Sequence, residues 1–600
     1  MVKKAKGNPG KWKLNLILLS FLLSFGAIIV RLFSIQVVNH GKYEALALEQ
    51  YRDLREIPPK RGDILSSDGY VLAGTQIKYL LYVEPQNVKN VDGLTTDLAK
   101  VISDFKAKDA GKEDYDKILL TYHDAIHSAL NSGLLWVAIE RNFSSEEKTK
   151  IEELKLEGVG FEDEPVRFYP AGTLAAHVLG FVASSEKGEK TGYFGVEGNL
   201  NEKLKGKYGR VVEEMDASGV PILAGKYRKV EPIDGGNIVL TLNRAVQYIV
   251  EKKLREGVEK YDAISGSVIV MEPYTGRIIA MANYPTYMPG DLSEPEVKDG
   301  EKEPPRRKTV EKRNLCISQT YEPGSVTKPV TISSAVDLGL ITPQTTFEDK
   351  GPVWYSDYVI DNWDGKHYGI QNIVQLLQKS NNIGAAWVGH QVGAKNLYRY
   401  MKDFGLGEET GVELEGEDSG VVRDYKAWTD IDLASASFGQ SISATPLQVL
   451  NAFNVIANGG YLLQPRVISQ IIDKNKTTEI PSKSLKRVIS KNTSQTMVDM
   501  LEKAAEGGEA KFYVLKEYKI AGKTGTAQIS EKGKYVQDRT NATFAGFLSQ
   551  SRKFSMIVKL EETRTSLYAS ETAAPLWMDI ASELIKFYGI APDKSVTSQL

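Results

Sequence analysis

The pattern of apolar and polar positions divides the chain into three parts. The first is an uncharged, strongly apolar run at residues 14–30. Seventeen helical residues span roughly 25 Å, slightly less than the hydrocarbon core of a bilayer. Apolar residues resume after Arg31, whose side chain can extend toward the membrane surface. We therefore predict a membrane-spanning helix over residues 14–35.

The flanks of this run predict its orientation. Residues 1–13 carry five lysines and no acidic residue, so we expect this tail to stay in the cytoplasm. No second long apolar run follows, which places the rest of the chain on the far side of the membrane. A cleaved signal peptide is the alternative interpretation. The run is longer than usual for such a peptide, and no small-x-small cleavage site follows it, so we favour an uncleaved anchor.

Residues 36–235 form the second part, in which short apolar strands alternate with polar turns rich in glycine. Apolar residues at helical spacing predict amphipathic helices over residues 94–104, 112–131 and 145–154. These helices do not make one large core in succession. We expect an elongated module of mixed α+β structure.

The third part, residues 236–590, has strands at both ends and helices between them. A strand, a helix and a hairpin open it, and a long polar loop follows at residues 285–313. This order predicts an α+β domain whose antiparallel sheet is built from distant parts of the chain, with residues 591–600 as a tail. The expected strands are 238–242, 266–273, 276–282, 518–526, 542–548 and 554–561, and the expected helices are 244–256, 326–338, 371–377, 383–392, 434–439, 446–458, 491–505 and 573–588.

Composition and charge exclude several classes of function. A length of 600 residues requires more than one domain, and a formal net charge of −2 removes the electrostatic basis for binding nucleic acid. The single cysteine, Cys316, excludes an intramolecular disulfide and a cysteine-based zinc site. His123 and His127 nearly match a zinc-protease motif but have Asp124 where the catalytic glutamate would stand. No third ligand stands out, so we expect a solvated helix face and no metal or other cofactor.

A serine and a lysine three residues apart mark the candidate nucleophile. Ser325 and Lys328 fall one helical turn from each other, which suits a hydroxyl nucleophile and the amine that activates it. The Pro-Gly pair before Ser325 indicates a turn, and Pro329 is tolerated in the first turn of a helix. The spacing alone is weak evidence, because three other pairs share it: Ser103 and Lys106, Ser145 and Lys148, and Ser184 and Lys187.

A second motif, Ser380-Asn381-Asn382, lies between two predicted helices and is too polar for the core. It fits the pattern S-x-N, although Asn381 stands where the related S-D-N motif has aspartate. Ser490-Lys491-Asn492 fits the same pattern, so position in the fold must decide between the two.

A third motif, Lys523-Thr524-Gly525, follows an apolar stretch on a predicted strand. Gly522 and Gly525 would let another backbone or a substrate approach this strand closely. A phosphate-binding loop is excluded, because it needs glycine at position 517, where this chain has glutamate. A second copy at residues 190–192 lies in a turn-like setting, and we expect it to be a surface turn.

The three motifs occur in the order S-x-x-K, S-x-N and K-T-G. They lie at the start of a predicted helix, in a loop between two helices and on a strand of the sheet, which are the places that this serine chemistry requires. On these residues the chain resembles the class B, monofunctional penicillin-binding proteins, from the anchor to about residue 590. No glycosyltransferase region precedes the second part, unlike the class A proteins. Further segments carry the resemblance: Arg61-Gly62-Asp63-Ile64, Tyr169-Pro170-Ala171-Gly172, Gly195-Val196-Glu197-Gly198, Phe438-Gly439-Gln440, Thr445-Pro446-Leu447-Gln448 and Ala457-Asn458-Gly459-Gly460.

The resemblance implies a pedestal domain at residues 36–235 and a transpeptidase domain, like a serine β-lactamase in fold, at residues 236–590. It implies that Ser325 attacks the D-Ala-D-Ala carbonyl of a peptidoglycan stem peptide and releases D-Ala. Lys328 would act as a neutral base, aided by partial burial and by a nearby cation. Ser380 would relay the proton to the leaving amine, and Asn382 would hold the substrate amide and orient the lysine.

The third motif would then bind the substrate. Lys523 is the nearby cation, and with Thr524, Gly525 and Thr526 it would bind the substrate carboxylate. The backbone N–H groups of Ser325 and Thr526 would form the oxyanion hole, in which one donor is typically worth about 3 kcal/mol.

The resemblance also implies partners: β-lactam antibiotics as ligands, a polytopic membrane glycan polymerase of the SEDS type, and other division proteins. Residues 31–38 and 57–62 look more like the division-specific branch than the side-wall branch. Spore-specific relatives share much of this pattern, but no extra C-terminal repeats follow residue 590. Three alternatives remain: a membrane-anchored serine β-lactamase, a β-lactam sensor, and a non-catalytic scaffold. The pedestal argues against the first, the short cytoplasmic tail against the second, and the full set of motif residues against the third.

Overall fold

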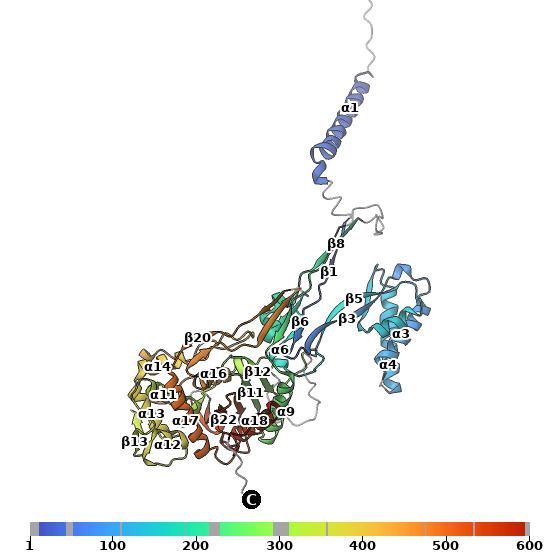
Figure 1. Ribbon diagram of the computed structural model, residues 1–600. Helices are drawn as coiled ribbons and strands as arrows, with labels where there is room; N and C mark the ends of the chain where they lie inside the picture. Colours follow the sequence, from blue (N-terminus) through green and yellow to red (C-terminus); the bar gives the residue numbers. More distant parts are fainter. Residues whose placement is uncertain are drawn as a thin grey trace, which may run out of the picture. The chain divides into compact units, whose positions relative to one another are not determined.

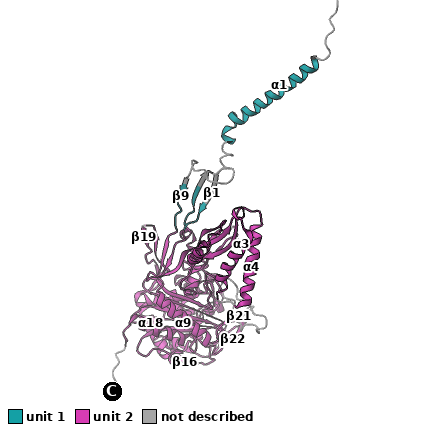
Figure 2. Ribbon diagram, turned by 90° about the vertical axis from the view of Figure 1, so that its right-hand side faces the viewer, with its two compact units in different colours: residues 1–59, 206–234 teal, residues 60–205, 235–600 magenta. Residues whose placement is uncertain are grey.

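The computed structural model describes residues 11–43, 52–108, 111–186, 188–214, 228–291, 311–355, 358–474, 476–531 and 534–593. The chain divides into two compact units, residues 1–59 with 206–234, and residues 60–205 with 235–600 (Figure 2). Most of the two predicted tails, and residues 292–310 of the predicted loop, lie outside the described residues.

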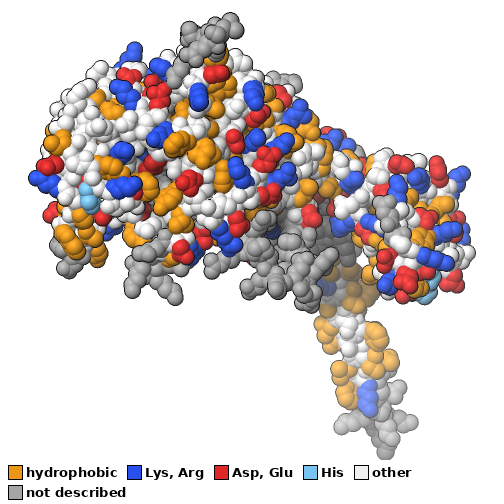
Figure 3. Space-filling view, turned by 90° about the horizontal axis from the view of Figure 1, so that it is seen from below, with side chains coloured by type: hydrophobic (Ala, Val, Ile, Leu, Met, Phe, Trp, Pro, Cys, Tyr) orange, Lys and Arg blue, Asp and Glu red, His pale blue; other side chains and the backbone are white. Residues whose placement is uncertain are grey.

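The first unit contains the apolar helix. Helix α1 (Lys11–Phe33) continues into a π-helical turn (Ser34–Val38), and residues Trp12–Val38 are long and apolar enough to cross a membrane. Hydrophobic side chains cover the visible face of this helix (Figure 3). The predicted anchor is thus present as one helix with exposed apolar side chains. The same unit holds an antiparallel sheet in the order β1 (Arg52–Ile57), β8 (Gly209–Glu214) and β9 (Arg228–Val230).

The second unit begins with a small α+β core. Its strands are β3 (Val71–Val83), β4 (Val137–Phe143) and β5 (Val159–Phe168), with β3 antiparallel to both others. The three predicted amphipathic helices are confirmed and pack their apolar faces into this core. Asn90 and Ser144 cap the first and third of them at the N-terminus. The helices are α3 (Val91–Lys106), α4 (Lys112–Leu130) and α5 (Ser145–Glu152).

One sheet joins the second and third parts of the sequence. Strand β2 (Ile64–Leu65) pairs antiparallel with β3 and parallel with β10 (Asn237–Leu240). Strand β10 pairs with β18 (Ile468–Asp473), which pairs with β19 (Lys476–Glu479). Residues on both sides of position 235 therefore share backbone hydrogen bonds. Short elements lie beside this sheet: α6 (Ala176–Leu179), β6 (Phe181–Ser184), β7 (Lys190–Tyr193), α7 (Gly195–Asn199) and α8 (Asn201–Leu204).

A buried ion cluster fixes the chain near this sheet. The Glu197 carboxylate, fully buried, accepts hydrogen bonds from Arg61 Nε at 2.7 Å and from Arg167 Nε at 2.6 Å. Arg61 also donates to Asn201, and Arg167 to the carbonyl of Gly62. One carboxylate thus holds together three segments that are far apart in the sequence.

The central sheet has five antiparallel strands in the order β12-β11-β23-β22-β21, which confirms the predicted sheet built from distant parts. Helices α9 (Arg244–Lys260) and α18 (Ala573–Tyr588) pack against it around the buried Trp577 (Figure 1). A Cβ on Gly257 would lie 2.5 Å from Leu576, so the two helices are in close contact. The strands are β11 (Ser265–Met271), β12 (Ile278–Tyr284), β21 (Ile520–Glu531), β22 (Lys534–Leu548) and β23 (Ser555–Glu561).

A helical block forms the other half of this part (Figure 1). Helix α16 lies in its core with every residue buried. The helices are α10 (Leu315–Ser318), α11 (Lys328–Asp337), α12 (Ile373–Lys379), α13 (Asn382–Val392), α14 (Ala394–Asp403), α15 (Asp430–Ala436), α16 (Pro446–Ala457) and α17 (Lys491–Gly507).

The small strands around this block were not predicted, and several predicted boundaries were wrong. The helix expected over residues 434–439 is α15 at Asp430–Ala436, and the strand expected over residues 542–548 is part of β22, which begins at Lys534. Gln371 lies in a strand, because Asn372 caps the helix and α12 begins only at Ile373. The small strands pair as β13 (Thr346–Asp349) with β16 (Gly369–Asn372), β14 (Val353–Tyr355) with β15 (Tyr358–Ile360), and β17 (Tyr461–Leu463) with β20 (Ser484–Arg487).

Candidate active site

The turn before Ser325 places this residue at the start of a helix. Gly324 has a φ of 61°, in the left-handed region that favours glycine, and residues Gly324–Thr327 form one 3-10 turn. Helix α11 continues from Lys328, with Pro329 in its first turn as the sequence predicts. Ser325 is half-buried and lines a cleft, whereas Lys328 is completely buried behind it.

The amine of Lys328 contacts the second motif. Its Nζ donates to the backbone oxygen of Ser380 at 2.5 Å and to Asn382 Oδ1 at 2.8 Å, and lies 3.3 Å from Ser380 Oγ. Ser380 ends α12 with a φ of 54°, which turns its carbonyl and its hydroxyl toward the lysine. The structure thus brings Ser325, Lys328, Ser380 and Asn382 together, as the sequence predicts.

This environment favours a neutral lysine. Burial lowers the pKa of Lys328 well below its ordinary value of 10.5, the positive charge of Lys523 lowers it further, and Glu509 opposes the shift. Burial also lowers the pKa of Lys523 itself, again opposed by Glu509. Both causes expected from the sequence, burial and a nearby cation, act on Lys328, and burial is the larger of the two.

The third motif lies on β21, directly beside the nucleophile turn. A Cβ added to Gly525 would lie 2.9 Å from the carbonyl oxygen of Pro323 and 3.0 Å from Val326 Cγ1. Any larger residue would push the strand away from Ser325. The close approach expected at this glycine is confirmed, and the approaching backbone is that of residues 323–326.

Hydrogen bonds within the protein already use some of the donors and acceptors of this motif. Lys523 Nζ donates to Thr524 Oγ1 at 3.0 Å, and Thr524 Oγ1 donates in turn to Glu509 Oε2 at 2.5 Å. Thr526 Oγ1 accepts from the backbone N–H of Ala569 at 3.0 Å, which leaves its own proton for a ligand.

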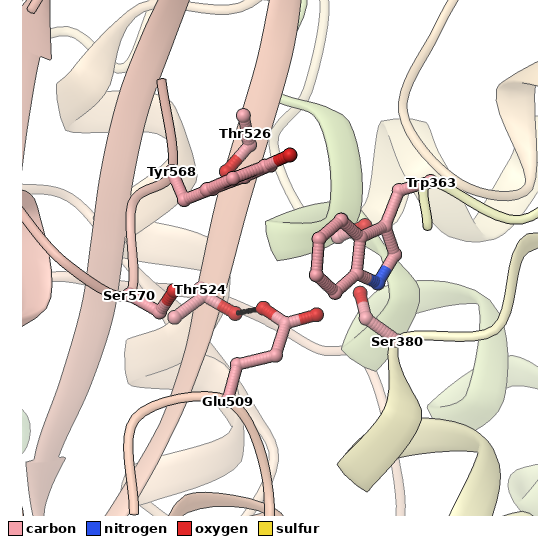
Figure 4. Close-up of a pocket in the computed structure, with 8 residues that line it drawn as sticks. Trp363, Ser380, Glu509, Thr524, Thr526, Tyr568 and Ser570 are labelled. Carbon is pink, nitrogen blue, oxygen red and sulfur yellow. Dashed lines mark hydrogen bonds between the residues drawn. The ribbon is translucent and has the colours of Figure 1, made fainter. Parts of the chain in front are cut away.

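All three motifs open into one cleft (Figure 4). Trp363 and Tyr568 lie over it from opposite sides, with ring centroids 5.2 Å apart. Four residues of the cleft lie on loops without a motif or a periodic pattern and were not predicted: Trp363, Glu509, Tyr568 and Ser570. The lining residues are Ser325, Trp363, Ser380, Glu509, Thr524, Thr526, Tyr568 and Ser570.

A second group that sequence reasoning missed supports the middle motif from behind. Asp349 Oδ2 accepts hydrogen bonds from Asn381 Nδ2 at 2.7 Å and from Asn362 Nδ2 at 2.8 Å. Asn362 Oδ1 in turn accepts from the backbone N–H of Asn382 at 3.0 Å. Asp349, on β13, therefore holds Asn381 and Asn362 behind the middle motif.

The other matches to these motifs in the sequence lie elsewhere in the fold. Ser103 is buried in α3 and donates to the carbonyl of Ala99, and Ser490 caps α17. Residues 190–192, expected to be a surface turn, lie instead in strand β7, which pairs with β6, so that prediction was wrong. His123 and His127 stack on α4, with each side chain about half exposed. Among the residues that the structure describes, no group of three or more His, Cys, Asp or Glu side chains is placed to hold a metal ion.

Comparison with known proteins agrees with this geometry. A model of the penicillin-binding protein transpeptidase domain matches residues 266–585, and one of the penicillin-binding protein dimerisation domain matches residues 56–240. Stage V sporulation protein D of Bacillus subtilis is 29% identical, with 96% of this chain and 86% of that protein covered. Peptidoglycan D,D-transpeptidase FtsI of Escherichia coli is 25% identical, with 98% and 93% covered.

A solved structure shows the same fold. Penicillin-binding protein 2X from Streptococcus thermophilus matches with a TM-score of 0.72 at 24% identity, over 90% of this chain and 80% of that one. The two family models together cover most of the chain, and the three motifs meet in one cleft of the matched domain. The chain therefore belongs to the class B penicillin-binding proteins, with a dimerisation domain followed by a transpeptidase domain.

Proposed function

We propose that this transpeptidase cross-links peptidoglycan through an acyl-enzyme on Ser325. Neutral Lys328 takes the Ser325 proton as Oγ attacks the carbonyl of the penultimate D-Ala of a stem peptide. The backbone N–H groups of Ser325 and Thr526 stabilise the negative charge that develops on the carbonyl oxygen. The C–N bond then breaks, and D-Ala leaves with the proton that Lys328 returns through Ser380.

The second half of the reaction reverses these steps. An amine of a neighbouring stem peptide attacks the ester carbonyl and loses a proton to Lys328, and the Ser325 oxygen leaves with a proton. Thr526, Lys523 and the backbone of Gly525 hold the carboxylate end of the donor. Because β-lactams mimic the donor, the same serine is acylated by them.

One observation carries this proposal: the buried Lys328 amine, held by Ser380 and Asn382, lies one helical turn from Ser325, which lines a cleft with Ser380, Thr524 and Thr526. Purified protein should release D-Ala from a D-Ala-D-Ala pentapeptide and transfer the acyl group to an added amine, as measured by chromatography. The Ser325→Ala variant should do neither. If that variant still releases D-Ala, Ser325 is not the nucleophile.

We infer further that the enzyme acts in septal wall synthesis. The support is the pattern of residues 31–38 and 57–62 and the similarity to FtsI. The similarity to a sporulation protein favours a spore-specific role as the second candidate. Depletion in the native cell decides between them. Filaments support the septal role, round cells a side-wall role, and normal growth with defective spores the sporulation role.

The apolar helix and its lysine-rich flank support a single-pass protein with a cytoplasmic N-terminus. The pedestal (residues 36–235) and the transpeptidase domain (residues 236–590) then lie outside the membrane, where they meet peptidoglycan. In this position the anchor and the pedestal would contact a polytopic glycan polymerase of the SEDS type and other division proteins. A C-terminal alkaline phosphatase fusion, which is active only outside the cytoplasm, should be active. An inactive fusion that is expressed at full length would show that the C-terminus lies in the cytoplasm and that the proposed orientation is wrong.

A further inference from the structure

Glu509 brings a carboxylate into the active-site cleft. It follows the C-terminus of α17, and its side chain lines the cleft together with Ser325, Ser380 and Thr524 (Figure 4). The two preceding glycines hold this loop in place, because a Cβ on Gly508 would lie 2.3 Å from the carbonyl oxygen of Ala504 and 2.9 Å from that of Gln378. The backbone before Glu509 is therefore closely packed, and Glu509 itself is partly buried.

Glu509 accepts the hydrogen bond that Thr524 would otherwise donate to a ligand carboxylate. A threonine hydroxyl has one proton to donate. Thr524 gives this proton to Glu509 Oε2 at 2.5 Å, while its oxygen accepts from Lys523 Nζ at 3.0 Å. A ligand carboxylate that is to bind Thr524 must compete with Glu509 for a single proton.

The negative charge of Glu509 also disfavours a ligand carboxylate in the cleft. Lys523 is buried, and the negative charge of Glu509 favours its charged form. Glu509 thus partly neutralises the cation that would attract a ligand carboxylate, and it also repels a second negative charge in the same cleft. A ligand that carries an ammonium group on this side would instead be attracted.

We propose that Glu509 is a specificity-determining residue that makes the cleft discriminate between ligands by the charge they carry beside Thr524. It disfavours a free carboxylate there and favours a cationic or hydrogen-bond-donating group. This inference rests on the proposed function, because it assumes that ligands acylate Ser325. The carboxylate of the natural donor is then held chiefly by Thr526 and Lys523.

Three probes that differ at one substituent, which carries a different charge in each, test this proposal. They are benzylpenicillin, its primary carboxamide and its 2-aminoethyl amide, with charges of −1, 0 and +1 on the group that replaces the carboxyl. The second-order rate constant for acylation of Ser325 is measured by mass spectrometry for the full-length wild type and for Glu509→Gln. Relative to the carboxamide, the variant should react about tenfold faster with benzylpenicillin, equivalent to about 1.4 kcal/mol, and about tenfold more slowly with the aminoethyl amide. The carboxamide is the reference, because Glu509→Gln also removes a charge that opposes the lowered pKa of Lys328, and this effect is common to the three probes.

The ratio of rates separates a charge effect from a structural one. Glu517→Gln is the matched control, since it makes the same change of charge at an exposed position in the following loop. It should leave all three rates as they are. If Glu509→Gln changes the three rates by one common factor, or changes none, Glu509 does not discriminate by charge and the inference is wrong. If the wild type forms no adduct with any probe, the proposed function fails as well.

Discussion

Replacing Asp349 by asparagine perturbs the support of the middle motif while keeping the size of the side chain. The Asp349 side chain is fully buried, and its carboxylate accepts four hydrogen bonds. Two come from the side chains of Asn381 and Asn362, and two, longer, from the backbone N–H groups of Tyr368 and Gly351. Asparagine keeps one accepting oxygen and places an NH₂ group where the other oxygen stood.

The size of the effect follows from these contacts. Hydrogen bonds to a charged group contribute about 1.5–3 kcal/mol and those to a neutral group about 0.5–1.5 kcal/mol, so the two short bonds together lose about 2 kcal/mol. The N–H of Gly351 then faces a donor and adds about 1 kcal/mol. We expect the free energy of unfolding to fall by roughly 2–4 kcal/mol. Because Asn362 and Asn381 position Ser380 and Asn382, acylation should slow by about 10–100-fold, the scale of a shift near 1 Å.

Two measurements check this prediction. Urea unfolding gives the loss of stability, and stopped-flow acylation by a fluorescent penicillin, under conditions where the variant is folded, gives the rate. The neighbouring Glu348→Gln serves as the control, since Glu348 is half exposed and paired with Lys350 at the surface. A folded Asp349→Asn variant that reacts at the wild-type rate would refute the idea that this carboxylate positions the motif.

The pH dependence adds an independent check. Burial raises the pKa of Asp349, but its hydrogen bonds from Asn381 and Asn362 outweigh burial and hold the pKa below its ordinary value of 3.8. A carboxylate with a lowered pKa stabilises the fold at pH values above its unfolded pKa, and this contribution is lost as the pH falls through the folded pKa. The difference in unfolding free energy between wild type and Asp349→Asn should be constant from pH 5 to 8 and should shrink below about pH 4.

Four further predictions concern the two buried lysines and the buried ion cluster. Lys328→Ala should abolish detectable acylation while leaving the melting temperature within a few degrees, and retained penicillin binding in this variant would mean that another base acts. In the wild type, the acylation rate should rise with pH through the lowered pKa of Lys328, since only the neutral amine accepts a proton. Lys523→Gln removes a like charge and so raises the pKa of Lys328, which should move the rise of the acylation rate to higher pH. If the rise stays at the same pH, burial alone lowers the pKa of Lys328. Glu197→Gln leaves Arg61 and Arg167 buried without their counter-ion and should cost about 3–5 kcal/mol in urea unfolding, whereas a loss below 1 kcal/mol would show that water replaces the carboxylate.

Long periodic segments and motif residues were predictable from the sequence. The helices over residues 94–104 and 112–131 carry enough apolar residues at helical spacing to be located within a few positions. The motif of Ser325 and Lys328 could be chosen over its decoys, because a turn precedes it and a helix follows it. Ser103 has the same spacing to a lysine, but it is buried in the last turn of a helix and does not begin one.

The supporting residues were not predictable, for a physical reason. Asp349 meets Asn381 only because the hairpin of β13 and β16 folds back on the middle motif, and strands of four residues leave no clear periodic signal. Glu509 follows a glycine pair that marks a helix end but not where the next side chain points. Contacts of this kind depend on tertiary packing, which the spacing of residues along one chain does not encode.

The most direct test of the central claim is to find where penicillin binds covalently. Full-length protein is incubated with benzylpenicillin, digested, and analysed by tandem mass spectrometry, with Lys328→Ala treated in parallel. We predict one adduct per chain in the wild type, on Ser325, and none in the variant. An adduct on another serine, or an unreactive but folded wild-type protein, would contradict the assignment of Ser325 as the nucleophile and of Lys328 as its base.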